Sequence, residues 1–287
     1  MGNGSAIHPE GIATFWAIAV VLFTAGSGDP DLFWSQRMFL ESVMRSLLLL
    51  AVCGGVLSTG LAAQADDYAE LKPLIEKGIE SAGGREKLTK RPVSVMKFSG
   101  VYHATGNATP FTGRVVRQRG EKSRIEVDNV YTVVFNGSQG WLAANGSVND
   151  LTMEQADNVK GDLHVERVTS LLPLGGDKFT VTKLGETQVN GKPAVGLKVE
   201  SAGQRTVELY LDKQSGLVVK RSAQTRSTEQ GGALVTEETV YTDYQTVDGL
   251  KLASKSVSHR DGSKYVELDA TQIEMAEKAN DAEFQRP

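Results

Sequence analysis

Cysteine is almost absent from this 287-residue chain. The one cysteine, Cys53, lies in a hydrophobic stretch near the N-terminus. The chain after residue 65 therefore has no cysteine, which excludes disulfides, iron–sulfur clusters and thiolate zinc sites there. An exported domain without cysteine is ordinary in a bacterial periplasm, whereas small secreted animal modules are usually cross-linked by disulfides.

An excess of charge of one sign is also missing. The chain has 31 basic and 35 acidic side chains and a formal net charge of −4, and the part after residue 65 is close to neutral. Nucleic-acid binding needs a basic surface, and anionic bilayers attract polybasic segments. We therefore predict no nucleic-acid partner.

Motifs for catalysis and metal binding are lacking as well. Three histidines follow residue 65, namely His103, His164 and His259, and none has a second ligand at a spacing such as H-x-x-x-H. The chain has no G-x-S-x-G motif, and its glycine pairs lack the lysine spacing of a phosphate loop. We predict no catalytic residue, no metal and no cofactor. A hydrolase whose acidic residues converge only in the fold stays open as a third alternative.

Residues 44–65 have the pattern of a secretory signal peptide. Arg45 precedes an apolar stretch, and Ala63-Gln64-Ala65 forms a small-residue cleavage site. Residues 1–43 are then either a misassigned start or an extra N-terminal segment. Their apolar stretch, residues 11–25, is shorter than the roughly 20 residues of a membrane span. Cys53 is either a lipidation site or an apolar residue of the leader.

The remainder, residues 66–287, is expected to be a single domain rich in antiparallel β-structure. Apolar residues at helical spacing predict one helix from about Leu71 to Ala82, with Pro73 in its first turn and Gly83-Gly84 as its stop. The capping box at Thr152 predicts a second helix that ends before Pro173. The expected strands cover residues 93–103, 111–118, 124–127, 130–135, 141–144, 187–189, 194–201, 206–211, 217–226, 234–246, 250–259 and 264–275.

The turns between these strands predict hairpins. Asn-Gly pairs at 136, 145 and 190 are favoured where both central residues need positive φ. We therefore expect an α+β fold, mainly antiparallel, of about ten to twelve strands and two helical segments. A strongly bent sheet or partial barrel is the natural solution, because a flat sheet of this size would leave one face uncovered.

Bulky apolar side chains on the early strands are the candidate ligand-binding residues. If the curled sheet is not filled, they would line a hollow suited to an acyl chain. The alternative is a packed core, because large side chains usually fill small barrels. The candidates are Phe98, Phe111, Val115, Ile125, Val133, Phe135 and Trp141.

Three stretches of the second half resemble the LolA/LolB-like outer-membrane lipoprotein-sorting superfamily. They are residues 209–213 with Gly216-Leu217, residues 241–252, and the closing residues 281–287. The order of leader, helix, strands, helix and hairpins extends the likeness over the chain after residue 65. The resemblance implies an unclosed (half) β-barrel, LolA-like, whose concave face covers the helices and accepts lipid or the acyl chains of a lipoprotein.

The function expected from these observations is an exported carrier or receptor, either free in the periplasm or associated with the outer membrane. Its partners would be a lipid or a lipidated protein, and a membrane-bound donor or acceptor protein. The alternative is a non-enzymatic structural or sensory module on the same scaffold, with a filled core and a protein partner.

Overall fold

Thirteen strands form one antiparallel sheet in the computed structural model, which describes residues 67–287. The predicted leader, Cys53 and the segment before residue 44 lie outside the described residues. The strands are β1 (Val93–Tyr102), β2 (Thr109–Gln118), β3 (Lys122–Val127), β4 (Tyr131–Phe135), β5 (Gly140–Ala144), β6 (Ser147–Asp150), β7 (Thr180–Val189), β8 (Lys192–Glu200), β9 (Val207–Asp212), β10 (Val218–Ser227), β11 (Ala233–Val247), β12 (Leu250–Arg260) and β13 (Ser263–Ala276).

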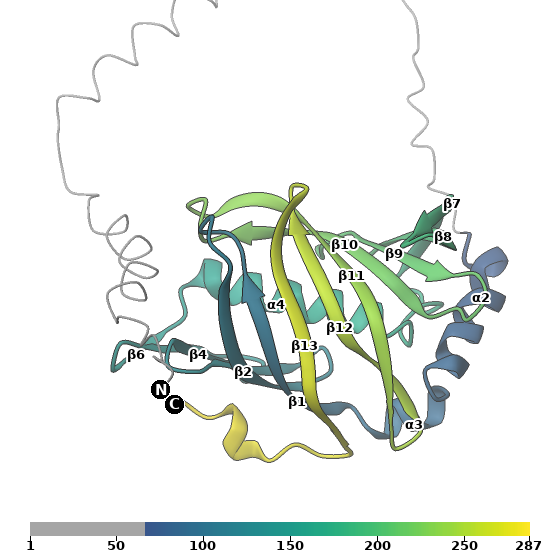
Figure 1. Cartoon of the computed structure of the whole chain (residues 1–287). Coiled ribbons are helices and arrows are strands. Elements are labelled where there is room, and N and C mark those ends of the chain that lie inside the picture. The colour runs from purple at the N-terminus through teal and green to yellow at the C-terminus, as the bar shows by residue number, and fades with distance from the viewer. Residues whose placement is uncertain (1–66) are drawn as a thin grey trace, which may run out of the picture. The chain divides into compact units, whose positions relative to one another are not determined.

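The order of the strands explains why the sheet stays open. The chain runs outward from β1 to β6, crosses to β7, and returns by successive hairpins to β13, which pairs with β1. Strands β6 and β7 are therefore the two edges. Helix α4 (Met153–Thr169) connects these edges and crosses the hollow side of the bent sheet (Figure 1). The predicted unclosed, mainly antiparallel half-barrel is confirmed.

All twelve expected strands are present, and β6 is the additional one. It consists of four mostly exposed residues after the Asn145-Gly146 turn, and its polar sequence gave no alternating signal. Both residues of that turn have positive φ, 52° and 73°, as do Asn190 and Gly191. At the Asn136-Gly137 pair only the glycine does, because the Asn136 side chain accepts hydrogen bonds from the backbone N–H groups of Ser138 and Gln139.

The two predicted helices exist, with one change of boundary. Helix α4 has the full capping box between Thr152 and Gln155. Helix α2 (Tyr68–Ser81) begins earlier than expected, so that Pro73 lies inside it. A short helix, α3 (Arg85–Lys90), and a 3₁₀ turn, η2 (Asp281–Phe284), were not predicted, because they are too short to show a periodic pattern. No helix within residues 67–287 is long and apolar enough to cross a membrane.

The main hydrophobic core fills one half of the hollow. Helices α2 and α4 press their apolar residues against the concave side of β7 to β10. Its largest fully buried members include Ile75, Ile79, Val168, Leu197, Leu209 and Leu211. A second, smaller cluster lies on the outer side of β1 to β5 and contains Val93, Val116, Val134, Trp141 and Phe284.

Helix α2 docks on the β9–β10 turn through two glycines in contact. A Cβ atom at Gly78 would lie 2.3 Å from the carbonyl oxygen of Gly216, and Gly216 itself has a φ of +75°. Backbone therefore meets backbone at this point. No side chain larger than hydrogen fits between the helix and the turn.

We predict that Gly78→Ala lowers the free energy of unfolding by about 2 kcal/mol, as overpacking does. Helix propensity alone predicts the opposite, a gain of about 1 kcal/mol. Urea unfolding of the purified variant would decide between them. Gly176→Ala is the control, because its Cβ would stay 3.5 Å from its nearest neighbour. A Gly78→Ala protein as stable as the wild type would contradict the close contact.

Candidate functional site

An apolar row crosses the concave side of the first five strands. Register places Met96, Val115, Ile125, Val133 and Leu142 directly opposite one another on β1 to β5. Ile273 on β13 extends the row beyond Met96. Directly opposed residues share one face of an antiparallel sheet. The row is on the side that faces α4, because Arg117, two residues from Val115, pairs with Glu166 of that helix at 3.3 Å.

Two phenylalanines widen this row into a surface. Phe98 lies opposite Gly113, and Phe111 lies opposite Gly100. A Cβ at Gly113 would come within 2.6 Å of the Phe98 ring, and one at Gly100 within 2.8 Å of the Phe111 ring. The rings therefore lie over the neighbouring strands, with their centroids 5.8 Å apart in an edge-to-face arrangement.

The row, the rings of Phe98 and Phe111, and Phe135 together form what we call the apolar concave face. Six of the seven predicted site residues belong to it. Phe98, Val115 and Phe135 are buried, whereas Phe111, Ile125 and Val133 keep partial exposure. None of the six belongs to the core that α2 and α4 form with β7 to β10. The hollow thus has a filled half and an apolar half that the helices leave partly uncovered.

Trp141 does not join the other six. It pairs with Val134, which alternates with Val133 and Phe135 along β4 and so points to the outer side. There it packs with Phe284 of the C-terminal segment. Trp141 was predicted to be a binding residue from its size, without regard to which face of β5 it occupies. The bulky residue of β5 on the concave side is Leu142.

The C-terminal segment is held on this outer side by charge as well as by Phe284. Glu283 accepts two hydrogen bonds from Arg114, at 2.9 and 2.7 Å, and one of its oxygens lies 3.9 Å from Arg124. Arg286 pairs with Asp150 at 2.7 Å. Trp141 is therefore a structural residue under this segment.

A polar anchor fixes the first half of α4. The Arg205 guanidinium lies against Gly161, where a Cβ would be 2.2 Å from its Nε. It donates to Asp162 at 2.6 Å and to the Asn158 side chain at 2.6 Å. Asn158 also accepts from the Thr225 hydroxyl, at 3.2 Å. Gly161 therefore allows a straight helix and a charged contact together.

Charged side chains occupy the middle of the hollow. A cavity of about 140 Å³ between α4 and β10 is lined by three arginines and three carboxylates. Burial alone would lower the pKa of the Arg221 guanidinium, but nearby acidic groups raise it instead. These groups are Tyr241, Glu237, Asp162 and Glu166. The cavity suits water or polar groups and does not suit an acyl chain.

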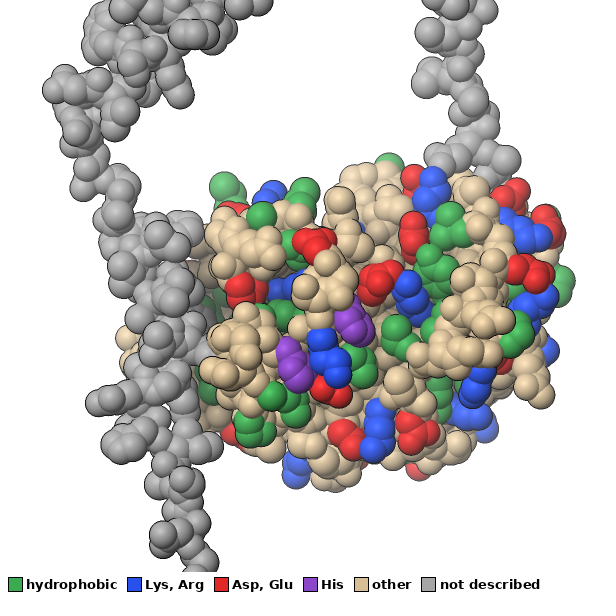
Figure 2. Space-filling model, turned by 45° about the horizontal axis from the view of Figure 1, so that its top comes forward, with side chains coloured by type: hydrophobic (Ala, Val, Ile, Leu, Met, Phe, Trp, Pro, Cys, Tyr) green, Lys and Arg blue, Asp and Glu red, His purple; other side chains and the backbone are tan. Residues whose placement is uncertain are grey.

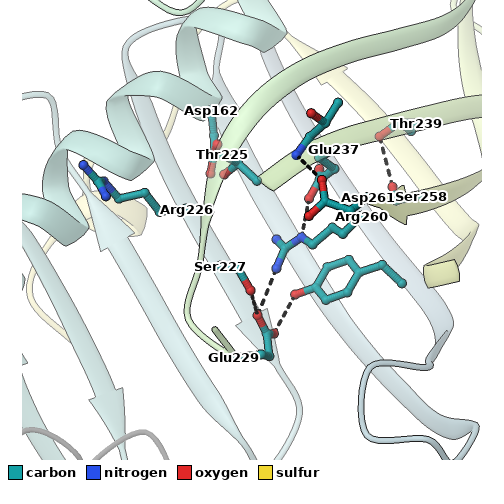
Figure 3. A network of polar contacts seen from close by, with 12 residues as sticks. Asp162, Thr225, Arg226, Ser227, Glu229, Glu237, Thr239, Ser258, Arg260 and Asp261 are labelled. Carbon is teal, nitrogen blue, oxygen red and sulfur yellow. Dashed lines mark hydrogen bonds and ion pairs between the residues drawn. The ribbon is translucent and has the colours of Figure 1, made fainter. Parts of the chain in front are cut away.

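The β10–β11 hairpin is bonded to the two central strands through its loop. It arches over the upper end of the sheet (Figure 1), and Glu229 in its loop bridges to β1 and β13 by accepting hydrogen bonds from Tyr102, 2.8 Å, and Tyr265, 3.0 Å. Ser227 and Arg260 also donate to Glu229, as Figure 3 shows. Burial raises the pKa of Glu229. Hydrogen bonds from its own backbone N–H, Tyr102 and Ser227, together with the charge of Arg260, outweigh burial and hold the pKa below its ordinary value.

We predict that Glu229→Gln lowers the free energy of unfolding by about 1–2 kcal/mol at pH 7, because bonds to a charged acceptor are lost. A carboxylate whose folded pKa is depressed stabilises the fold above its unfolded pKa, about 4.3. The difference from the wild type should therefore shrink as the pH falls below that value. Urea unfolding between pH 7 and pH 3 measures it.

The exposed Glu86 provides the control for this experiment. Glu86→Gln should change the stability by no more than about 0.5 kcal/mol at any of these pH values. A Glu229→Gln protein whose deficit stays constant down to pH 3 would show that the charge of Glu229 does not hold the hairpin.

A larger, open pocket lies where the two halves of the sheet face each other across α4. Its volume is about 660 Å³, and it adjoins the apolar concave face through Phe135. One stripe of α4 contributes Lys160, Leu163, His164 and Arg167. The β2–β3, β4–β5, α4–β7 and β8–β9 connections contribute the rest of the wall. This helix stripe, at spacings of three and four residues, was the signal in the sequence that could have located the pocket.

Surface charge elsewhere is mixed. On the side seen in Figure 2, basic, acidic and hydrophobic side chains are interspersed over the coloured surface. Within residues 67–287, no group of three or more histidine, cysteine, aspartate or glutamate side chains is arranged to hold a metal ion.

Comparison with known proteins gives a structural likeness only. No family model matches the chain, and no curated protein matches it. Among solved structures, a LolA superfamily protein from Nitrosomonas europaea is similar with a TM-score of 0.52 at 12% identity, over 75% of this chain and 97% of that one. A DUF1329 family protein from Desulfovibrio piger has a TM-score of 0.49 at 13% identity, over 75% and 97%. The fold of residues 67–287 is LolA-like, as the sequence resemblance implied.

Proposed function

We propose that this protein is an exported periplasmic carrier or receptor that binds a lipid, or the acyl chains of a lipidated protein, on its apolar concave face. No covalent step is required. Each methylene that leaves water gains about 0.8 kcal/mol, so a long chain supplies the affinity by itself. A membrane-bound donor or acceptor protein would deliver or remove the cargo by offering a better site.

The observation that carries the proposal is the partly exposed row on β1 to β5. Soluble domains normally cover such a continuous apolar surface, and an uncovered one marks a binding site. Helices α2 and α4 bury the facing half of the hollow against β7 to β10 and leave this row out. The row follows the strand-to-strand direction over six neighbouring strands, roughly 24 Å at about 4.8 Å per strand. That length suits an extended acyl chain.

A second candidate is the non-enzymatic structural or sensory module with a protein partner. The solid packing of the β7–β10 half supports it. In that case the first five strands would bind a peptide or a protein surface. The two candidates differ in whether the isolated protein takes up lipid.

We predict that protein purified from the full-length sequence carries lipid, visible by native mass spectrometry, and that the delipidated protein binds a fluorescent fatty acid. The double variant Ile125→Thr with Val133→Thr should bind the fatty acid about tenfold more weakly. Each hydroxyl placed against the acyl chain lowers the binding free energy by about 0.7 kcal/mol. Fluorescence titration measures the affinity.

The matched control is Val95→Thr with Val101→Thr, because both residues point to the outer side of β1. Val95 packs against the outer cluster, and Val101 pairs with Glu267 there. This control should bind like the wild type. Absence of copurified lipid together with no uptake by the delipidated protein would reject the carrier and favour the structural or sensory module.

A further inference from the structure

The pocket beside the apolar concave face has an unbalanced set of charges. Its lining includes four basic residues, Lys122, Lys160, Arg167 and Lys178, and one acidic residue, Glu121, but the ammonium of Lys122 lies on the outer side of the sheet beside Asp281 and Phe284. The part of the chain after residue 65 is close to neutral. The pocket is therefore a local concentration of positive charge, and this contrast is what a recognition site for an anion requires.

Two of these cations are not neutralised by the protein. Lys122 lies 3.5 Å from Asp281, and Lys160 lies 3.0 Å from Asp157. The side chains of Arg167 and Lys178 have no hydrogen bond or ion pair to any other residue in the part of the chain that the structure describes. One comes from α4 and the other from the loop before β7, so they approach the pocket from two sides.

The pocket also has an apolar floor that continues from the concave face. Phe135, Leu163 and Phe179 line it together with the cations. Phe179 is held by stacking on His164, with ring centroids 6.2 Å apart and planes at 10°. A ligand that is apolar along its length and anionic at one end would match the floor and the rim together.

From this geometry we infer that the pocket binds the anionic headgroup of a lipid whose acyl chain lies on the apolar concave face. The inference rests on the proposed function and adds the charge of the cargo to it. Arg167 and Lys178 contact the headgroup, and Phe135 marks the point where the headgroup ends and the chain begins. An uncharged headgroup would leave both cations unpaired, and the quaternary ammonium of a zwitterionic headgroup would offset the attraction of its phosphate for them, so both would bind less tightly.

The test compares two lysolipids with the same palmitoyl chain, below their critical micelle concentrations. Lysophosphatidylglycerol is anionic and lysophosphatidylcholine is zwitterionic. We expect delipidated protein to bind the anionic one about tenfold more tightly, the effect of two exposed charge contacts. Arg167→Gln with Lys178→Gln should reduce this preference to about twofold or less and leave the affinity for lysophosphatidylcholine unchanged.

The control for charge removal is Lys97→Gln with Lys251→Gln. Both lysines are exposed and lie outside the pocket lining. This variant should keep the tenfold preference. If the wild type binds both lysolipids equally, or if the preference survives in the Arg167→Gln with Lys178→Gln variant, the headgroup assignment is wrong while the proposed carrier function stands. If neither lysolipid binds, the headgroup assignment is wrong, and the carrier function fails as well when the fluorescent fatty acid is not taken up and no lipid copurifies.

His164 provides a readout at the pocket itself. Burial, together with Arg167 and Arg205, lowers the pKa of its imidazole. An anion beside Arg167 would offset part of that positive charge, so the pKa of His164 measured by NMR should rise with lysophosphatidylglycerol and rise less with lysophosphatidylcholine, whose own cation offsets its phosphate. Inorganic phosphate is the third ligand to be tested in this NMR titration. If phosphate alone raises the pKa equally at the same concentration, the pocket is a phosphate site and the lipid assignment is overturned.

Discussion

Helix α4 has to pass through the hollow of the sheet, because it connects the two strands that form the edges. Its 17 residues span roughly 25 Å. A helix inside the curve keeps β6 and β7 apart, so the sheet cannot close into a barrel. The open form of the sheet follows from this single connection.

The contacts of α4 differ along its length. As a result, the hollow has a packed half at β7 to β10 and a less covered half at β1 to β5. The second half of α4 packs Val165 and Val168 into the core with α2 and β7 to β10. Its first half is positioned by the guanidinium of Arg205 against Gly161 and Asn158. Polar contacts through Arg205 hold this half of the helix without burying apolar side chains. The apolar residues on the concave side of β1 to β5 are therefore not needed to hold α4.

The architecture could be predicted from local signals in the sequence. Alternating strands, the positive-φ turns at Asn145-Gly146 and Asn190-Gly191, and the capping box at Thr152 each depend on neighbouring residues only. The boundary of α2 was misjudged, because tertiary packing of Leu71 and Ile75 overrides the local cost of Pro73.

The candidate site was predictable only in part, for a related reason. Bulky apolar residues on the first strands mark a buried surface, but which face each one takes depends on register, and a shift of one residue reverses it. Trp141 is on the outer side for this reason. The cationic pocket gave no single motif, because Arg167 of α4 and Lys178 of the loop before β7 meet in one pocket only once the chain has folded.

The pairing of β1 with β13 also sets the order in which the protein can be completed. The first strand, β1, pairs with the last strand, β13, over ten residues. The outer cluster is complete only when Phe284 is present. Such contacts, distant in sequence, form late and slowly. A chain that crosses a membrane with its N-terminus first would therefore emerge without its central strand pair. It would complete the sheet only once β13 has crossed, with the apolar concave face of β1 to β5 exposed until then.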